Sequence, residues 1–468
     1  MSVSGRFFLV FLAAKGVLSA FLVCCLSGGG ELAIPLQAQD LAAGARDSAL
    51  PSLGDSTPPS ETLEDAWRAA LASDQRLEAS QWNLSAAQST WSAAKAERYP
   101  SLKLGTDYYV LSDQPRVSMD LPPLPFPMPN SFPIVDRESF GVQAYVSQPI
   151  YTFGRISSGI AAAQHGVQAN EAEVSRTRLD VKMNVAEIYV TVLRAGRLIE
   201  VAEARAVSLA GHNKDVTNLF DKGLVSRNDL LAAQVAWADA RQQAMQARNG
   251  LRVAHAAYNR ALGRSLTEPV MLAELQDEGG LGDVEELTGT AMQLRPELAG
   301  LAAQTRALQE QSASLRAKKA PQISVLGGYL FQENQQISPN GLAGAVLLMQ
   351  WNPIDCGRVG NQAASLDEKA EAMIRLRRDA ETMVALEVRQ KWLDLQTARE
   401  RVDVTRQATT QADENLRVVR DRYQHQVGTN TEVLDAETLR VQAYTNFYNS
   451  SYEAVLARLR LRRAIGDL

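Results

Sequence analysis

Cysteine and histidine are scarce in this sequence of 468 residues, and no catalytic motif stands out. Cys24 and Cys25 lie in an N-terminal apolar run and Cys356 is the third cysteine, so an intramolecular disulfide in the mature chain is not expected. The four histidines are scattered, without the paired spacing of metal ligands, and the sequence has no Gly-rich phosphate loop or nucleophile elbow. We therefore expect no enzyme, no cofactor and no metal site.

Aromatic residues and an excess of one charge are lacking as well. Aromatics form 6% of the chain, and the formal net charge is −5, spread along the sequence. A modest and dispersed charge does not favour nucleic-acid binding. Few aromatics together with abundant Ala, Gln and Arg are typical of long packed helices.

The N-terminal region is typical of an export signal. Arg6 and Lys15 precede an apolar run at 17–26, which is too short to span a bilayer stably. We predict a signal peptide over 1–38, with a candidate cleavage site at 36–38. Lipidation of Cys24 or Cys25 is an alternative, although the small residue expected before the cysteine is absent or is itself Cys. Residues 39–60, rich in Gly, Ser, Ala and Pro, are predicted to be a disordered leader.

The rest of the chain contains an internal repeat. FDKGLVSRNDLLAAQ at 220–234 aligns without a gap with YQHQVGTNTEVLDAE at 423–437, and the same offset of 203 places Gly154 on Gly357. We predict a first structural repeat over 61–264, an irregular acidic segment over 265–286 and a second repeat over 287–468. The acids of the irregular segment, Asp277 among them, are expected to be solvated.

Each repeat is predicted to run helix, strand, loop, strand, long helix, turn, helix. Period-2 alternation indicates strands at 102–110, 140–147, 323–331 and 342–351. Helices are expected at 61–100, 155–220, 226–263 and 287–318, and again in the second long hairpin. A segment at 112–136 with seven prolines separates the first two strands. Neither a strand nor a helix is expected to persist in it.

The helix at 226–263 indicates how the helices pack. Mostly small residues recur in it at spacings of three and four, as in a coiled-coil seam: Ala233, Ala236, Ala240, Ala244, Ala247, Leu251, Ala254, Tyr258 and Ala261. An ordinary coiled coil would explain this helix alone. The four strands favour another arrangement, because isolated hairpins are unstable in water and a membrane accepts strands only in a closed sheet. Four strands are too few to close one, so other subunits must complete it.

Several motifs, duplicated in the right order, resemble those of TolC-type outer-membrane factors. They are TLEDAWRAAL at 62–71, YPSL at 99–102, QPIY at 148–151 before Gly154-Arg155, and VGTNTEVLDAE at 427–437. The resemblance covers about 61–468. It implies a mainly α chain with a transmembrane β part: a homotrimer in which four strands per chain complete a twelve-stranded outer-membrane β-barrel, continued by a periplasmic α-barrel of coiled-coil hairpins.

The resemblance also assigns roles to the two hairpin tips. In the family both tips meet a periplasmic adaptor protein, and the matching positions are Gly223, Leu224, Val225, Ser226, Gly428, Thr429, Asn430 and Thr431. The alternative is that Gly and Ser or Thr only turn the chain and cap the returning helix. Two departures from the family pattern stand out, Asn430 where an Arg is frequent and Gln426 where a Gly is common.

Glu432 and Asp435 match the paired acidic positions of the family's pore constriction. They are three residues apart and share one helix face. In a trimer they would form rings of carboxylates that favour cations. The alternative is a solvated pair near a helix N-terminus, which the helix dipole favours.

The function that the resemblance implies is the outer-membrane channel of a tripartite efflux pump. Such a channel would take small molecules from an inner-membrane RND or ABC transporter and the adaptor, with outer-membrane lipid around its strands and the loop at 112–136 outside the cell. A duct for type I protein secretion is the alternative within the family. A soluble periplasmic coiled-coil adaptor is the alternative from another class.

Overall fold

The computed structural model describes residues 60–118, 131–277, 279–280, 282–336 and 338–468. The chain divides into two units, Met1–Thr57 and Pro58–Leu468, and the described residues all lie in the second. The predicted signal peptide lies outside the described residues, as does the predicted leader apart from its last residue. Within the described residues, no helix carries an apolar stretch long enough to cross a bilayer.

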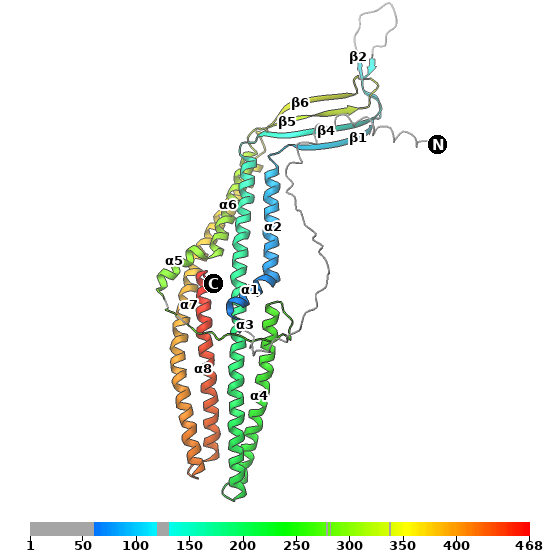
Figure 1. The fold of residues 1–468 in the computed structure, drawn as a ribbon. Helices are drawn as coiled ribbons and strands as arrows, with labels where there is room; N and C mark the ends of the chain where they lie inside the picture. The colour runs from blue at the N-terminus through cyan, green and yellow to red at the C-terminus, as the bar shows by residue number, and fades with distance from the viewer. Residues whose placement is uncertain (1–59, 119–130, 278, 281, 337) are drawn as a thin grey trace, which may run out of the picture. The chain divides into compact units, whose positions relative to one another are not determined.

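Helices dominate the second unit, and they occur as pairs of equal or nearly equal length (Figure 1). Two long helices of 67 residues each lead to the tips, and helices of 35 and 36 residues return from them. The bounds are α1 Leu63–Ser73, α2 Gln75–Ala96, α3 Arg155–Asp221, α4 Arg227–Ala261, α5 Val284–Leu294, α6 Pro296–Ala317, α7 Arg358–Gln424 and α8 Asn430–Ile465.

Two helices that were expected to be continuous are each broken once. The predicted helix at 61–100 ends at Ser73 and restarts at Gln75. The Asp74 backbone is extended, and its side chain accepts hydrogen bonds from the amides of Arg76 and Leu77, as an N-cap. The predicted helix at 287–318 is broken at Arg295. A residue before proline avoids the helical conformation, and Pro296 begins α6. The single-helix prediction was wrong in both halves.

The four predicted strands are present and form one antiparallel sheet in the order β1-β4-β5-β6. Their bounds are Ser101–Val110, Glu138–Tyr151, Gln322–Gln332 and Gly341–Gln350. The β1–β4 register pairs Leu102 with Val146 and Tyr108 with Phe140. Among the described residues β1 and β6 have no second neighbour in this sheet. A strand edge with free amides and carbonyls is a template for another chain.

The proline-rich segment also contains strands, against the prediction. Short strands β2 (Arg116–Ser118) and β3 (Ser131–Pro133) pair with each other. Most of the prolines lie between these strands, in residues 119–130, which the structure does not describe. Pro133 pairs only at the end of β3, where a missing amide donor is tolerated. Short strands therefore occur in the described part of this segment, next to Pro115 and including Pro133.

The turn from sheet to helix is built identically in the two halves. Phe153 and Cys356 have φ of 50° and 52°, and each precedes a glycine with φ of 91° or 86° at the N-cap of the long helix. A non-glycine residue in the left-handed region is uncommon. At this turn, residues that are 203 positions apart in the sequence therefore also have the same backbone conformation.

Helix α3 is central to the packing, with contacts to α1, α2, α4, α6 and α8. A large core lies where α1, α3, α4 and α8 meet, around the fully buried Tyr189 and Tyr258. The seam predicted in α4 is confirmed, because all nine of its members are buried or half-buried. Since α3 and α7 both start at the sheet and both end at a tip, the two tips lie at the end away from the sheet (Figure 1).

Candidate functional site: the two hairpin tips

The first tip is a tight turn followed by a well-capped helix. After α3, Gly223 has φ of 73°, and the amide of Leu224 donates to the carbonyl of Leu219 at 2.9 Å. The Ser226 hydroxyl then accepts from the amide of Asp229 at 3.2 Å, and the Asp229 carboxylate accepts from the amide of Ser226 at 3.2 Å. This reciprocal capping box satisfies two free amides at the start of α4.

The second tip has the same backbone with different side chains. Gln426 has φ of 62° at the position of Gly223, and the amide of Val427 donates to the Arg422 carbonyl at 2.9 Å. Thr429 caps α8 by accepting from the amide of Glu432 at 3.2 Å. The departure of Gln426 from the family pattern therefore places a side chain in a conformation that favours glycine.

Replacing Gln426 by Gly is expected to raise the free energy of unfolding by about 1 kcal/mol, because Gly removes the steric cost of the left-handed conformation. Urea unfolding followed by far-UV circular dichroism measures the change. Gln424→Gly, at the exposed last residue of α7, is the matched control and should lower stability by about 0.5 kcal/mol. Equal losses in the two variants would contradict the assignment of strain to Gln426.

Each tip exposes one large apolar side chain. Leu224 is 50% exposed and Val427 is 66% exposed, and the two are equivalent under the repeat. Val427 was not among the residues singled out from the sequence, although the offset of 203 from Leu224 could have found it. Of the other residues at the predicted docking positions, Gly223, Ser226, Thr429 and Thr431 are exposed, Val225 and Gly428 are half-buried and Asn430 is buried.

Asn430 lies between the two hairpins rather than on the surface. Its Oδ1 atom is 2.7 Å from Nε2 of His212 on α3, and its amide nitrogen donates to the carbonyl of Asp229 at 3.2 Å. His212 is 5% exposed, and its ring packs against Tyr423 of α7 with centroids 5.3 Å apart. Asn430 therefore joins the start of α8 to both helices of the first hairpin.

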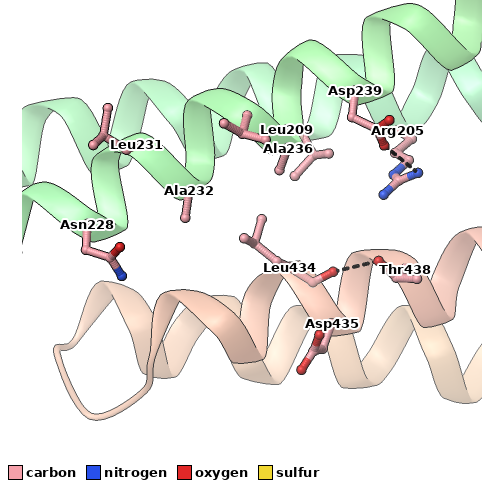
Figure 2. A pocket seen from close by; sticks show the side chains of 11 residues that line it. Arg205, Leu209, Asn228, Leu231, Ala232, Ala236, Asp239, Leu434, Asp435 and Thr438 are labelled. Carbon is pink, nitrogen blue, oxygen red and sulfur yellow. Dashed lines mark hydrogen bonds and ion pairs between the residues drawn. The ribbon is translucent and has the colours of Figure 1, made fainter.

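Glu432 and Asp435 occupy different surroundings. Glu432 is half-buried, and its carboxylate is 3.8 Å from the guanidinium of Arg422 at the end of α7. Asp435 is exposed and borders a groove of about 530 Å³ between α4 and α8, together with Leu231 and Leu434 (Figure 2). The two acids therefore share a helix but differ in their neighbours.

Glu437 is a third acid of α8 that the sequence reasoning did not single out. It is 1% exposed, and its carboxylate binds the Ser208 hydroxyl of α3 and the Arg420 guanidinium of α7. Asn430, Val433 and Glu437 are all buried at spacings of three and four. This spacing could have indicated that they share the face of α8 that meets α3.

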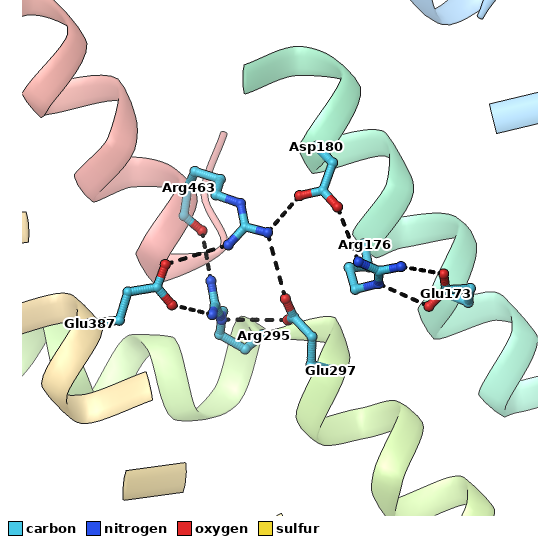
Figure 3. Close-up of polar contacts among 7 residues, drawn as sticks. All are labelled: Glu173, Arg176, Asp180, Arg295, Glu297, Glu387 and Arg463. Carbon is cyan, nitrogen blue, oxygen red and sulfur yellow. Dashed lines mark hydrogen bonds and ion pairs between the residues drawn. The ribbon is translucent and has the colours of Figure 1, made fainter. Parts of the chain in front are cut away.

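A second set of charges joins the hairpins far from the tips, where the helices of the two halves meet. Arg463 of α8 contacts Asp180 of α3, Glu297 of α6 and Glu387 of α7 (Figure 3). Arg295, which is 7% exposed, also pairs with Glu387. Because the carboxylates are shared between arginines, the network fixes the relative positions of four helices.

Asp277 in the irregular segment is not solvated, contrary to the prediction. Its carboxylate pairs with Arg399 of α7 and Arg458 of α8, and only 12% of its side chain is exposed. The hydrogen bonds from these arginines lower the pKa of Asp277 despite its burial. Asp277 therefore attaches the irregular segment to the α7–α8 hairpin.

The sequence matches the family model described as outer membrane efflux protein over residues 66–264 and 287–467. The chain belongs to this family. The channel is 23% identical over 337 residues to the outer membrane protein TolC of Vibrio cholerae, covering 69% of this chain and 75% of that protein.

Among solved structures, the channel is similar to VceC from Vibrio cholerae and to CusC. For VceC the TM-score is 0.71 at 18% identity, covering 86% of this chain and 96% of that chain. For CusC the values are 0.73 and 17%, covering 91% and 99%. These likenesses confirm the mainly helical fold with long hairpins and four antiparallel strands.

Family membership confirms the recognition made from the duplicated motifs. The protein is an outer-membrane efflux channel with a periplasmic helical extension, as predicted, and its family is one of channels rather than enzymes. The alternative of a soluble adaptor is therefore set aside.

Proposed function

We propose that this channel is the outer-membrane component of a tripartite efflux pump. It receives small molecules from an inner-membrane RND or ABC transporter through a periplasmic adaptor protein that docks on the hairpin tips. The observation that carries the proposal is the pair of equivalent tips, which end the two hairpins on the same side and each present an exposed apolar side chain, Leu224 and Val427. Two like sites on one chain suit an adaptor that contacts both hairpins.

Assembly as a homotrimer supports the same proposal. The sheet ends in β1 and β6, and three copies that pair these edges in turn give twelve strands without a free edge. Alternate residues of β1 are apolar and largely exposed: Leu102, Leu104, Tyr108 and Val110. This face suits contact with outer-membrane lipid, and the loop at 112–136 then lies outside the cell.

The docking surface that we propose consists of the exposed positions of the two tips. In the first tip they are Gly223, Leu224 and Ser226, and in the second they are Val427, Thr429 and Thr431. Val225, Gly428 and Asn430 hold the turns beneath this surface. Val225 packs against a small core at the tips, and Asn430 is hydrogen-bonded between the hairpins. Their contribution to docking is therefore to keep the turns in shape.

Replacing Leu224 and Val427 together by Asp is expected to abolish drug export while leaving a folded trimer. A carboxylate at each apolar contact must be desolvated on docking, which opposes association. The measurement is accumulation of a fluorescent pump substrate in the native host after deletion of the gene and complementation with the variant. Accumulation should rise to the level of the deletion strain.

Val207→Asp is the matched control for this experiment. Val207 lies on α3, well before the tip, and it is 73% exposed although α3 packs between other helices. The Val207→Asp change therefore adds a charge away from the docking surface. Export should be retained in this variant. Wild-type export by the Leu224→Asp/Val427→Asp trimer would place adaptor docking elsewhere.

A further inference from the structure

A buried polar cluster joins the two hairpins just beneath the tips. His212 of α3 and Asn430 of α8 are hydrogen-bonded at 2.7 Å, and both are nearly inaccessible to solvent. Asn430 can only accept through Oδ1, so Nε2 of His212 carries the proton of this bond. The Tyr423 ring lies against the imidazole, with centroids 5.3 Å apart. His212 thereby contacts both arms of the second hairpin from the first.

Burial of the site favours the neutral imidazole over its protonated form. Burial lowers the pKa of His212, and the positive charge of Arg420 on α7 acts in the same direction. The hydrogen bond to Asn430, the neighbouring Asp215 on α3 and Glu437 on α8 oppose this shift without cancelling it. The Glu437 carboxylate is already bound by Arg420 and Ser208. From α4, the Asp229 carboxylate faces its own helix cap.

We propose that His212 and Asn430 form a proton-sensitive latch between the two hairpins: neutral His212 holds the α7–α8 hairpin against α3, and protonation of its ring releases it. Released hairpins can separate at their tips, which widens the end of the channel. The inference rests on the proposed function in one respect, namely that the tips bound the periplasmic mouth.

The sign of the pH dependence follows from the two states of the histidine. In the separated state the ring is hydrated and titrates near its usual 6.5, whereas in the packed state its pKa is lower. The separated state therefore binds more protons, and acid favours it. The latch is fully stabilising above pH 6.5 and is progressively lost as the pH falls below that value.

The experiment measures hairpin separation and conductance in the same purified trimers. Spin labels on Lys222→Cys and Gln424→Cys, two exposed positions next to the tips, report the distance between hairpins in a Cys356→Ser background. Planar-bilayer conductance is recorded in parallel between about pH 8 and about pH 5. We expect a longer-distance population and a several-fold rise in conductance at the acidic end.

Two variants and one control assign these changes to the latch. His212→Gln keeps an N–H donor but cannot be protonated, so both pH responses should vanish while the protein stays packed. Asn430→Ala removes the acceptor and should give the acidic behaviour already at neutral pH. His425→Gln removes a histidine that is exposed at the second tip, and it should leave the pH response unchanged.

The outcomes separate the latch from the proposed function. A pH response that persists in His212→Gln, or that is lost in His425→Gln, overturns the latch. Unaltered behaviour of Asn430→Ala at neutral pH overturns it as well. If the distance between the hairpins responds to pH in a His212-dependent way but conductance does not change, the latch is upheld. The mouth of the channel then lies elsewhere.

Discussion

Replacing Glu432 and Asp435 together by Ala is expected to reduce the preference of the channel for cations by roughly tenfold, without loss of the trimer. We propose that in the trimer these residues place six carboxylates at the narrow end of a water-filled duct. Like charges held close together raise the local concentration of cations and repel anions. The measurement is the reversal potential of planar-bilayer recordings under a salt gradient, with block by divalent cations as a second readout.

Because Glu432 and Asp435 have different surroundings, we expect them to contribute unequally to the cation preference. Glu432 is 3.8 Å from Arg422, so its charge is partly compensated, whereas Asp435 is exposed beside the groove. Asp435→Ala should therefore account for most of the change. The effect should also shrink as salt is raised, because exposed charges are screened within about 10 Å at 0.1 M ionic strength.

Asp221→Ala is the control for a general effect of charge at this end of the molecule. Asp221 is an exposed acid at the end of α3, in the first tip. Its loss should leave selectivity nearly unchanged. If the Glu432→Ala/Asp435→Ala channel kept wild-type selectivity and cation block, these acids would lie outside the constriction.

Tyr189→Ala is expected to lower the free energy of unfolding by about 3–5 kcal/mol, the usual cost of truncating a buried aromatic residue. Tyr189 has no exposed surface, and its hydroxyl lies 2.8 Å from the carbonyl of Glu61 and 2.7 Å from that of Ala273. Burial raises its pKa, so the hydroxyl remains a hydrogen-bond donor. The residue thus ties α3 to the start of the unit and to the irregular segment.

Tyr189→Phe separates the hydrogen bonds from the ring. Only the hydroxyl is lost, and we expect a cost of about 1–3 kcal/mol because buried carbonyls lose a donor. Urea unfolding gives the energies, and limited proteolysis within 265–277 reports release of the segment. Tyr99→Phe, at a tyrosine that is 69% exposed, should change neither. A Tyr189→Phe protein as stable as the wild type would show that packing alone fixes this junction.

Local pattern predicted most of the fold. Alternation along β1 and β4 and the seam of α4 are properties of short stretches, and the repeat allowed each half to support the other. The break at Pro296 has a local signal, because the residue before a proline avoids the helical conformation. The break at Asp74 depends on a single side chain acting as a cap, which length and periodicity do not reveal.

The candidate site was predicted less completely, because burial at the tips depends on contacts between distant segments. Asn430 is 218 residues from His212 in sequence, and nothing within the tip motif indicates that they meet. The same holds for Asp277, whose two arginines lie on α7 and α8 more than a hundred residues away. Turn chemistry was predictable at Gly223 and Ser226, since it involves only neighbours in the chain.

The matched lengths of α3 and α7 restrict how this protein can change in size. Each has 67 residues, which is about 100 Å of helix, and both start from the same kind of turn. Inserting seven residues into α3 and α4 alone would advance the first tip by about 10 Å and leave the second behind. The two tips would then lie at different distances from the sheet, and an adaptor could not contact both in the same way. We therefore expect a homologue that spans a wider periplasm to carry paired insertions, equal in length and placed at corresponding points of both hairpins.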